Sequence, residues 1–274
     1  MIQFKNVRKE YPDGTVAVND FTLDIPSHEV VVLLGSSGCG KTTLMRMVNR
    51  MVDPTSGTVS IDGEDVANTD PVKLRRSIGY VMQSGGLMPH RTVVDNVATV
   101  PLLLGNTRRA AHARAAELLE IVGLEQSVAK RYPSQLSGGQ RQRIGVARAL
   151  ASDPNILLMD EPFGAVDPVV RAELQTELLK LQQDLAKTIL FVTHDVDEAF
   201  LLGQKVLVLR AGAEVAQNGS PADILLDPAN DFVTNFIGGP RRRLRTERRN
   251  GRHIVVDAAG RLTGVMQDDP LVTG

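Results

Sequence analysis

The sequence predicts an α/β fold in which a mostly parallel sheet is flanked by helices and extended by an antiparallel β layer and an inserted helical subdomain. Three observations support this prediction. Short apolar runs alternate with longer helical patterns, residues 1–61 hold strand-like runs joined by turn residues, and residues 85–150 are mostly helical in pattern. Strands that alternate with helices favour a parallel sheet, whereas strands joined by short turns favour antiparallel pairing.

The parallel strands are predicted from short, mainly apolar runs without polar alternation, a pattern typical of strands buried on both faces. These runs are Val30–Leu34, Ile78–Met82, Ile156–Met159, Ile189–Val192 and Lys205–Leu209. Helical patterns separate them. The predicted helices are Lys41–Arg50, Thr107–Val122, Ser137–Ala151 and Val169–Ala186.

The antiparallel layer is predicted from runs at Ile2–Val7, Val16–Ile25 and Thr58–Ile61, with turns at "PDG" and "DG". The helical insertion has a single proline-bounded break, near "RYPSQ". We therefore expect a core formed by residues 1–84 and 151–239 and a helical subdomain at 85–150. Residues 240–274 are expected to form an Arg-rich linker and a short tail.

Composition excludes several classes of protein. Lys and Arg number 31 against 32 Asp and Glu, so a net charge of −1 gives no overall field to attract nucleic acid. Cys39 is the only cysteine, which excludes an intrachain disulfide. The longest apolar runs are far shorter than the ~20 residues that span a bilayer. We expect a cytosolic chain unless another protein holds it at a membrane.

The segment "GSSGCGKTT", residues 35–43, fits the phosphate-loop pattern G-x-x-x-x-G-K-[ST], and it follows a predicted strand and precedes a predicted helix. Backbone N–H groups of such a turn wrap a phosphate, the lysine neutralises the outer phosphates, and the first threonine hydroxyl ligates Mg²⁺. The other interpretation is a glycine-rich turn without a ligand. The predicted ATP-binding residues of this phosphate-loop NTPase core are Gly35, Ser36, Ser37, Gly38, Cys39, Gly40, Lys41, Thr42 and Thr43.

The run "ILLMDEP" places two acidic residues at the carboxyl end of a buried strand, where α/β sheets bind ligands. Asp160 is predicted to hold Mg²⁺ together with Thr42. Glu161 is predicted to polarise the water that attacks the γ-phosphate. Taken alone, this acidic pair also fits the start of a capped helix.

The segment "LSGGQ", residues 136–140, precedes a predicted helix. The Ser137 hydroxyl and the glycine amides at a helix N-terminus form an anion site, to which the helix dipole contributes about 0.3–1 kcal/mol. A plain serine cap followed by an adaptable glycine pair is the other interpretation.

Together these motifs resemble ATP-binding cassette ATPases, the nucleotide-binding subunits of ABC transporters. The resemblance covers about residues 2–238, and the motifs stand in the order of that family. They are the phosphate loop, Gln83 in "YVMQ", "LSGGQ", "LLMDE", "AVD" with Asp167, and "VTHD" with His194.

The resemblance implies a role for each matched position. Ser137, Gly138, Gly139 and Gln140 of one subunit would close over the ATP held by a second subunit, in a homodimer. Gln83 would contact Mg²⁺ and the attacking water, His194 the γ-phosphate, and Tyr11 the adenine ring. Asp167 would communicate between the two ATP sites. The implied Mg²⁺ ligands are Thr42, Gln83 and Asp160.

Three positions depart from the family pattern. His28 stands where a turn glycine is usual, Arg141 where glutamine is usual, and Gly164 where serine is usual. None of these departures removes a catalytic group.

Within the family, the stretch "LMPHRTVVDNVATVPLLLG" resembles ATPase subunits of importers for osmoprotectants such as glycine betaine, choline, carnitine and proline. This resemblance implies transmembrane permease subunits, an extracytoplasmic solute-binding protein, and a location at the cytoplasmic face of the membrane. The segment "SGGLMPHRTVVDNV" would contact the permease. An importer of amino acids or other small solutes is the alternative. A cassette ATPase acting on nucleic acid or ribosomes is disfavoured because the chain has neither a tandem cassette nor a heptad run.

The C-terminal residues divide into two parts. "PRRRLRTERRNGR" is read as a solvated linker, with contact to anionic lipid headgroups as the alternative. "HIVVDAAGRLTGVM" resembles about half of a cystathionine-β-synthase-type repeat.

Overall fold

The computed structural model describes residues 1–83, 85–164, 166–238, 245–249, 252–256 and 262–265. Contacts divide the chain into two compact units, Met1–Pro221 and Ala222–Gly274. This division falls before residue 239, where the sequence analysis ends the core. Residues 84 and 165 and parts of the 240–274 tail lie outside the described residues.

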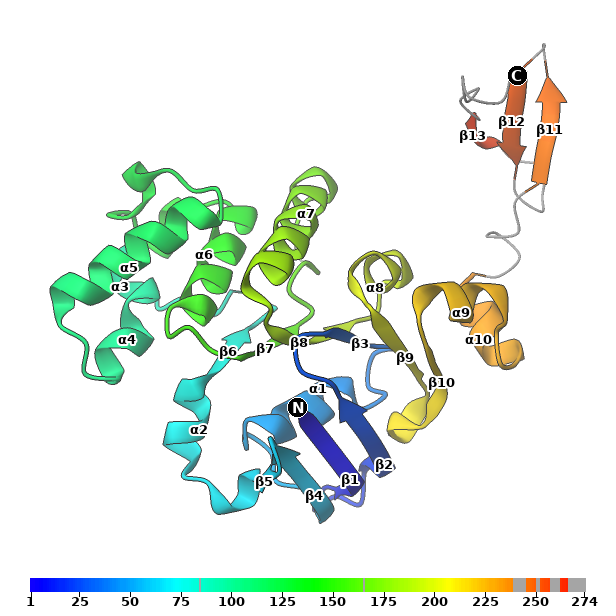
Figure 1. Ribbon diagram of the computed structural model, residues 1–274, viewed down its shortest axis with the longest axis horizontal. Coiled ribbons are helices and arrows are strands. Elements are labelled where there is room, and N and C mark those ends of the chain that lie inside the picture. The colour runs from blue at the N-terminus through cyan, green and yellow to red at the C-terminus, as the bar shows by residue number, and fades with distance from the viewer. Residues whose placement is uncertain (84, 165, 239–244, 250–251, 257–261, 266–274) are drawn as a thin grey trace. The chain divides into compact units, whose positions relative to one another are not determined.

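The first unit contains two sheets (Figure 1). The six-stranded sheet has the order β10-β9-β3-β8-β7-β6, with β6, β7, β8, β3 and β9 parallel and β10 antiparallel to β9. Its strands are β3 (Val30–Gly35), β6 (Ile78–Val81), β7 (Ile156–Asp160), β8 (Thr188–Thr193), β9 (Lys205–Leu209) and β10 (Val215–Gly219). The predicted parallel core is confirmed, whereas β10 was not predicted.

The second sheet is the predicted antiparallel layer, in the order β2-β1-β4-β5. Its strands are β1 (Ile2–Glu10), β2 (Val16–Ile25), β4 (Ser56–Ile61) and β5 (Glu64–Asp65). Helix α1 (Lys41–Val48) contacts strands of both sheets. The hydrophobic core includes the edge-to-face pair Phe4 and Phe21, with ring centroids 5.4 Å apart.

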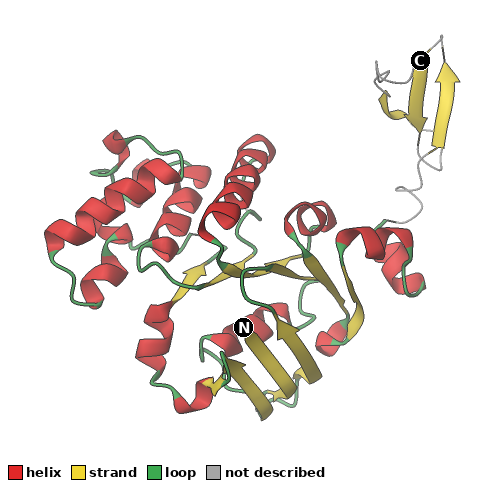
Figure 2. Ribbon diagram, in the orientation of Figure 1, coloured by secondary structure: helices red, strands yellow, loops and turns green. Residues whose placement is uncertain are grey.

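Helices cover both faces of the six-stranded sheet (Figure 2). Helix α1 lies on the face of the antiparallel layer, and α7 and α8 lie on the other. The helices after α1 are α2 (Pro71–Ser77), α3 (Val93–Val97), α4 (Thr99–Leu103), α5 (Arg108–Ile121), α6 (Gly138–Leu150), α7 (Pro168–Leu185) and α8 (Val196–Leu202). Helices α3 to α6 gather beside β6, where α6 contacts that strand.

Several predicted boundaries were too long. Helix α1 ends at Val48 rather than Arg50, because Arg50 has a φ of 53° and leaves the helical conformation. Helix α7 stops before Ala186, which takes the left-handed conformation. Strand β6 ends at Val81, and the side chain of Met82 is exposed. The sequence therefore predicts these elements better than their ends.

The second unit contains α9 (Pro221–Leu226) from Ala222 onward, α10 (Asp231–Phe236) and a three-stranded antiparallel sheet. Its strands are β11 (Arg245–Arg249), β12 (Arg252–Val256) and β13 (Leu262–Val265). The predicted linker and half-repeat fall partly on these strands and partly outside the described residues. Across the described residues of both units, every helix is too short or too polar to cross a lipid bilayer.

Candidate active site

The phosphate loop, Gly35–Thr43, connects the end of β3 to α1 and contains glycines with distinct physical roles. Gly40 has a φ of 110°, and a Cβ there would lie 2.4 Å from the backbone oxygen of Ala17. Gly38 has a φ of 80°, yet a Cβ on it would meet no atom within 4 Å. Gly40 is therefore needed both for close packing and for its positive φ. Gly38 is needed for its positive φ, and the space beside it is open.

The lysine of this loop is held inside the loop itself. Lys41 is 4% exposed, and its Nζ donates hydrogen bonds to the carbonyls of Gly35 at 2.7 Å and Ser36 at 2.8 Å. These two bonds hold the ammonium group beside the backbone turn that phosphate loops use to wrap phosphates. The loop therefore places a buried cation and a bare backbone together within one chain.

A hydroxyl and a carboxylate meet beside the loop. Thr42 Oγ1 donates to Asp160 Oδ1 at 2.9 Å, and the Tyr80 hydroxyl donates to Asp160 Oδ2 at 3.4 Å. Burial, followed by the Asp160 charge, raises the pKa of Tyr80. Among the described residues no cluster of three or more His, Cys, Asp or Glu could hold a metal by itself. The oxygen pair fits Mg²⁺, which prefers one or two protein oxygens together with water and phosphate.

Glu161 brings together three segments that are far apart in the sequence. Its Oε2 lies 3.3 Å from Gln83 Nε2, which donates to it, and 3.1 Å from His194 Nδ1. The three residues follow β6, β7 and β8, so the carboxyl ends of neighbouring parallel strands assemble this cluster. Glu161 has a φ of 43°, a conformation that costs of order 1–3 kcal/mol outside glycine and is concentrated at functional sites.

The departure at Gly164 lies directly against this cluster. A Cβ at residue 164 would lie 3.3 Å from Gln83 Nε2 and 3.7 Å from Glu161 Oε2. The glycine therefore leaves slightly more room beside the amide than a serine would. The departure at His28 is accommodated differently, because His28 takes a φ of 66° and its Nδ1 contacts the carbonyl of Ala186.

The signature turn, Leu136–Gln140, caps α6. Ser137 Oγ accepts from the Gln140 N–H at 3.2 Å, and Gln140 Oε1 accepts from the Ser137 N–H at 3.1 Å, forming a capping box. A Cβ on Gly139 would lie 2.5 Å from Val170 Cγ1 of α7, so this glycine permits close packing. Arg141 Nη1 donates to the carbonyl of Leu136 at 2.7 Å and steadies the turn.

The structure does not join the signature turn to the phosphate loop of the same chain. Ser137 and Gly138 are exposed, and no hydrogen bond or ion pair links either of them to Lys41 or Thr42 within the described parts of the chain. Tyr11 also stands apart, 36% exposed, with Lys9 Nζ 5.2 Å from its ring centroid. Its ring is therefore not packed into the core.

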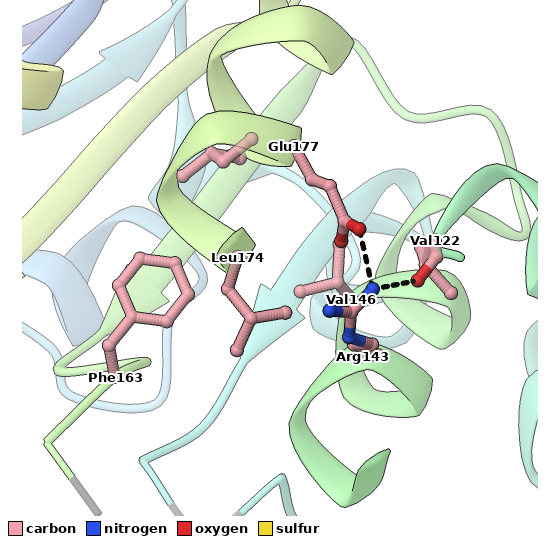
Figure 3. A pocket seen from close by; sticks show the side chains of 7 residues that line it. Val122, Arg143, Val146, Phe163, Leu174 and Glu177 are labelled. Carbon is pink, nitrogen blue, oxygen red and sulfur yellow. Dashed lines mark hydrogen bonds and ion pairs between the residues drawn. The ribbon is translucent and has the colours of Figure 1, made fainter. Parts of the chain in front are cut away.

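The helical insertion meets the core at a small apolar pocket that no motif predicts. Figure 3 shows Arg143 of α6 reaching Glu177 of α7 and the carbonyl of Val122, the latter at 3.0 Å. Arg143 also donates to Glu173 at 2.9 Å. Apolar side chains, including Phe163, line the pocket below. Phe163 lies two residues after Glu161, so this junction adjoins the segment that carries Glu161.

Comparisons with known proteins identify the family of this chain. The ABC transporter family matches residues 18–164, which is more than half of the chain. This chain belongs to the ABC transporter family. Two dimeric structures of a bacterial ABC transporter cassette are similar to this chain. The first is 36% identical, covers 81% of this chain and 99% of its own, and has a TM-score of 0.74. The second is described as a post-hydrolysis state bound to ADP and Pi, with 35% identity and a TM-score of 0.74.

Curated ABC transporter relatives are ATP-binding proteins of osmoprotectant uptake. A carnitine transport ATP-binding protein of Listeria monocytogenes is 52% identical over 241 residues, covering 88% of this chain and 60% of its own length. A glycine betaine/carnitine/choline transport ATP-binding protein of Bacillus subtilis is also 52% identical, with coverages of 88% and 63%. A glycine betaine uptake protein of Escherichia coli is 48% identical, with coverages of 87% and 77%. The chain thus spans about three fifths of the first two relatives.

Proposed function

We propose that this chain is the ATP-hydrolysing subunit of an ABC importer for osmoprotectants, with glycine betaine, choline and carnitine as the substrate class. The observation that carries the proposal is the Glu161 cluster beside the phosphate loop. A carboxylate held by an amide and an imidazole, next to a buried lysine and a hydroxyl–carboxylate pair, is suited to hydrolysis of a nucleotide triphosphate.

In this proposal the phosphate-loop amides and Lys41 bind the phosphates of ATP. Glu161 orients and polarises a water for in-line attack on the γ-phosphorus, while the bond to the bridging oxygen breaks and ADP leaves. Gln83 and His194 hold the Glu161 carboxylate in place. Thr42 and Asp160 would hold Mg²⁺, with Gln83 as a third ligand, and the bound ion supplies positive charge against the phosphate oxygens.

The proposal includes a homodimer in which each signature turn completes the ATP site of the other copy. Its support is that Ser137 and Gly138 are exposed at a helix N-terminus, and that no hydrogen bond or ion pair among the described residues links them to Lys41 or Thr42. The γ-phosphate needs donors from several sides, and each charge-assisted hydrogen bond is worth about 1.5–3 kcal/mol. ATP bound between two copies would then hold the dimer closed until hydrolysis removes these contacts. Asp167 would pass changes between the two sites, and Tyr11 would stack on adenine.

Transport requires transmembrane permease subunits, which would hold this chain at the cytoplasmic face of the membrane, and an extracytoplasmic solute-binding protein. The names of the relatives support the solute class, because they refer to carnitine, glycine betaine and choline. Exposed apolar side chains at Leu103 and Leu104 of the helical subdomain, and at Met82 just before it, support a protein partner. Leu87 and Met88, proposed to meet the permease, are half-buried, and the adjacent Pro89 is exposed.

The experiment is co-purification with the permease and solute-binding proteins of the same organism, followed by reconstitution in liposomes. We expect glycine betaine, choline or carnitine to stimulate ATP hydrolysis several-fold in the complete complex. Amino acids without a quaternary amine serve as the matched control, because they test the alternative solute class. Stimulation by DNA or ribosomes without membrane proteins would instead overturn the transport assignment.

A further inference from the structure

Four side chains form a two-rung polar ladder between α7 and α8. Arg171 and Gln175 lie one turn apart on α7, and Asp195 and Glu198 lie at the start of α8. In the upper rung, Arg171 Nη1 lies 3.4 Å from Asp195 Oδ2. In the lower rung, Gln175 Nε2 donates to Glu198 Oε1 at 3.3 Å. The two helices contact each other, and the ladder fixes their polar sides in register.

The lower rung, the hydrogen bond between Gln175 and Glu198, is buried. Gln175 is 8% exposed and Glu198 5% exposed. Burial raises the pKa of the Glu198 carboxyl, although hydrogen bonds from Thr193 and Gln175 act in the opposite direction. Polar groups this buried are costly to separate from their partners, so this rung holds the two helices together.

The upper rung reaches two segments of the active site. Arg171 Nη2 donates to the carbonyl of Val166 at 3.3 Å, one residue before Asp167. Asp195 directly follows His194, and its Oδ1 accepts from the N–H groups of Asp197 at 2.9 Å and Glu198 at 3.1 Å. The guanidinium therefore ties the backbone beside Asp167 to the cap of the helix beside His194.

The residues flanking His194 are both fixed by this network. The Asp195 N–H donates to Thr193 Oγ1 at 3.0 Å. The Nε of Arg171 is buried and has no hydrogen-bond partner in the described structure, so Val166 and Asp195 set the orientation of the guanidinium. A displacement of this cap would move the imidazole that lies 3.1 Å from Glu161.

We propose that Arg171 is a positioning residue that acts through Asp195 and the Val166 carbonyl to keep the Asp167 and His194 segments in one mutual arrangement. The inference rests on the proposed ATP hydrolysis. It adds a route within one chain by which the Asp167 loop and the Glu161–His194 pair affect each other. A displacement of about 1 Å in a catalytic group can cost on the order of 10²-fold in rate, so a modest loosening of this tie is measurable.

The kinetic test uses Arg171→Met, Asp195→Asn and the double variant. Asp195→Asn retains the Oδ1 oxygen that caps α8 and removes the charge that faces Arg171. Each single variant should lower kcat by about 10- to 100-fold, with KM for ATP within about twofold of wild type because the phosphate loop is untouched. The double variant should be no slower than the slower single variant. Unchanged kcat, or losses that multiply in the double variant, would overturn the proposal.

The matched control is the exposed ion pair of α5, where Arg114 Nη1 lies 3.1 Å from Glu117 Oε2. Arg114→Met makes the same Arg-to-Met change away from the active site, and it should leave kcat unchanged. If Arg171→Met does not fold, Arg171→Lys replaces it, because the ammonium retains the charge and can satisfy only one of the two acceptors. A partial loss of kcat with Lys is then the expected result.

Amide hydrogen exchange separates this inference from the proposed function. Arg171→Met should raise the exchange of residues 193–198 several-fold, although the substitution lies on α7. Asp195→Asn should likewise raise the exchange of residues 166–170. Changes confined to the substituted segment would refute the tie, even if the wild-type protein hydrolysed no ATP. Absence of hydrolysis alongside coupled exchange would refute the proposed function and leave the tie supported.

Discussion

The phosphate loop and the signature turn are both glycine-containing turns that lead into a helix, yet they are completed in different ways. In the phosphate loop, Lys41 is buried and bonded to two carbonyls of the same loop, and Thr42 meets Asp160 at 2.9 Å. In the signature turn, Ser137 and Gln140 form a reciprocal pair of hydrogen bonds and the serine is exposed. The first turn has its chemical groups within one chain, whereas we propose that the second presents backbone donors to the ATP bound by another copy.

A site shared between two copies of one chain needs two such turns with different completion. A turn that assembles with its own core binds ligand as a monomer. A turn that is merely well capped contributes only when another surface brings the ligand to it. Binding and hydrolysis should therefore respond differently to substitutions in the two turns.

Lys41→Ala should give the largest effect. Loss of the ammonium removes about two charge-assisted hydrogen bonds to phosphate, each worth about 1.5–3 kcal/mol, so ATP affinity should fall by roughly 10²- to 10⁴-fold. Isothermal titration calorimetry of the isolated chain measures this directly. Lys73→Ala, on the exposed side of α2, is the matched control and should bind ATP normally. Normal binding by Lys41→Ala would mean that the loop is not the nucleotide site.

Glu161→Gln should slow hydrolysis by at least ~10²-fold while retaining ATP affinity, since the carboxylate acts on the attacking water. Because ATP persists in this variant, the two turns should stay joined through it. Light scattering in ATP should then report a dimer, and the same protein in ADP should be a monomer. A variant that remained monomeric in ATP would contradict the proposal that the signature turn completes a shared site.

The phosphate loop could be predicted from sequence because its essential residues are contiguous and the strand and helix around it are strongly patterned. The cluster of Gln83, Glu161 and His194 was predicted residue by residue, from the rule for strand ends and from the family resemblance. Their mutual distances were not predicted. Those distances depend on the order of β6, β7 and β8 in the sheet, which spacing along the chain does not specify.

The residues that the sequence does not predict depend on contacts between elements that are distant along the chain. Tyr80 meets Asp160 only because β6 lies beside β7. Arg143 and Arg171 meet their carboxylate partners where α7 contacts α6 and α8, and an arginine on a helix surface usually indicates only a solvated face. Tertiary packing gave these side chains their partners, so no local pattern distinguishes them.

Ser137→Ala should lower ATP hydrolysis by about 10-fold, as expected for loss of one charge-assisted donor, while ATP binding to the monomer stays within twofold. The substitution also removes a helix cap worth about 0.5–2 kcal/mol, so stability must be separated from function. Thr107→Ala removes the equivalent cap of α5, where Thr107 Oγ1 accepts from the Ala110 N–H at 3.3 Å. Thr107→Ala should lower stability similarly and leave the specific ATPase rate unchanged. An equal loss of rate in both variants would assign the effect to capping alone.

Of these four substitutions Gly139→Ala should have the smallest effect, a small decrease in the free energy of unfolding. It compares directly how the two turns use glycine. Its Cβ would meet a methyl carbon of the Val170 side chain at 2.5 Å, whereas a Cβ on Gly40 would meet a backbone oxygen at 2.4 Å with a φ of 110°. Alanine is also favoured over glycine inside a helix by about 1 kcal/mol, which offsets much of the overpacking cost of roughly 1–3 kcal/mol. We therefore expect Gly139→Ala to lower the free energy of unfolding, measured with urea, by about 1 kcal/mol. Adding Val170→Ala should restore most of that loss, because it removes the crowded methyl groups. If the second substitution restored nothing, the close contact between α6 and α7 would not be the reason for glycine at residue 139.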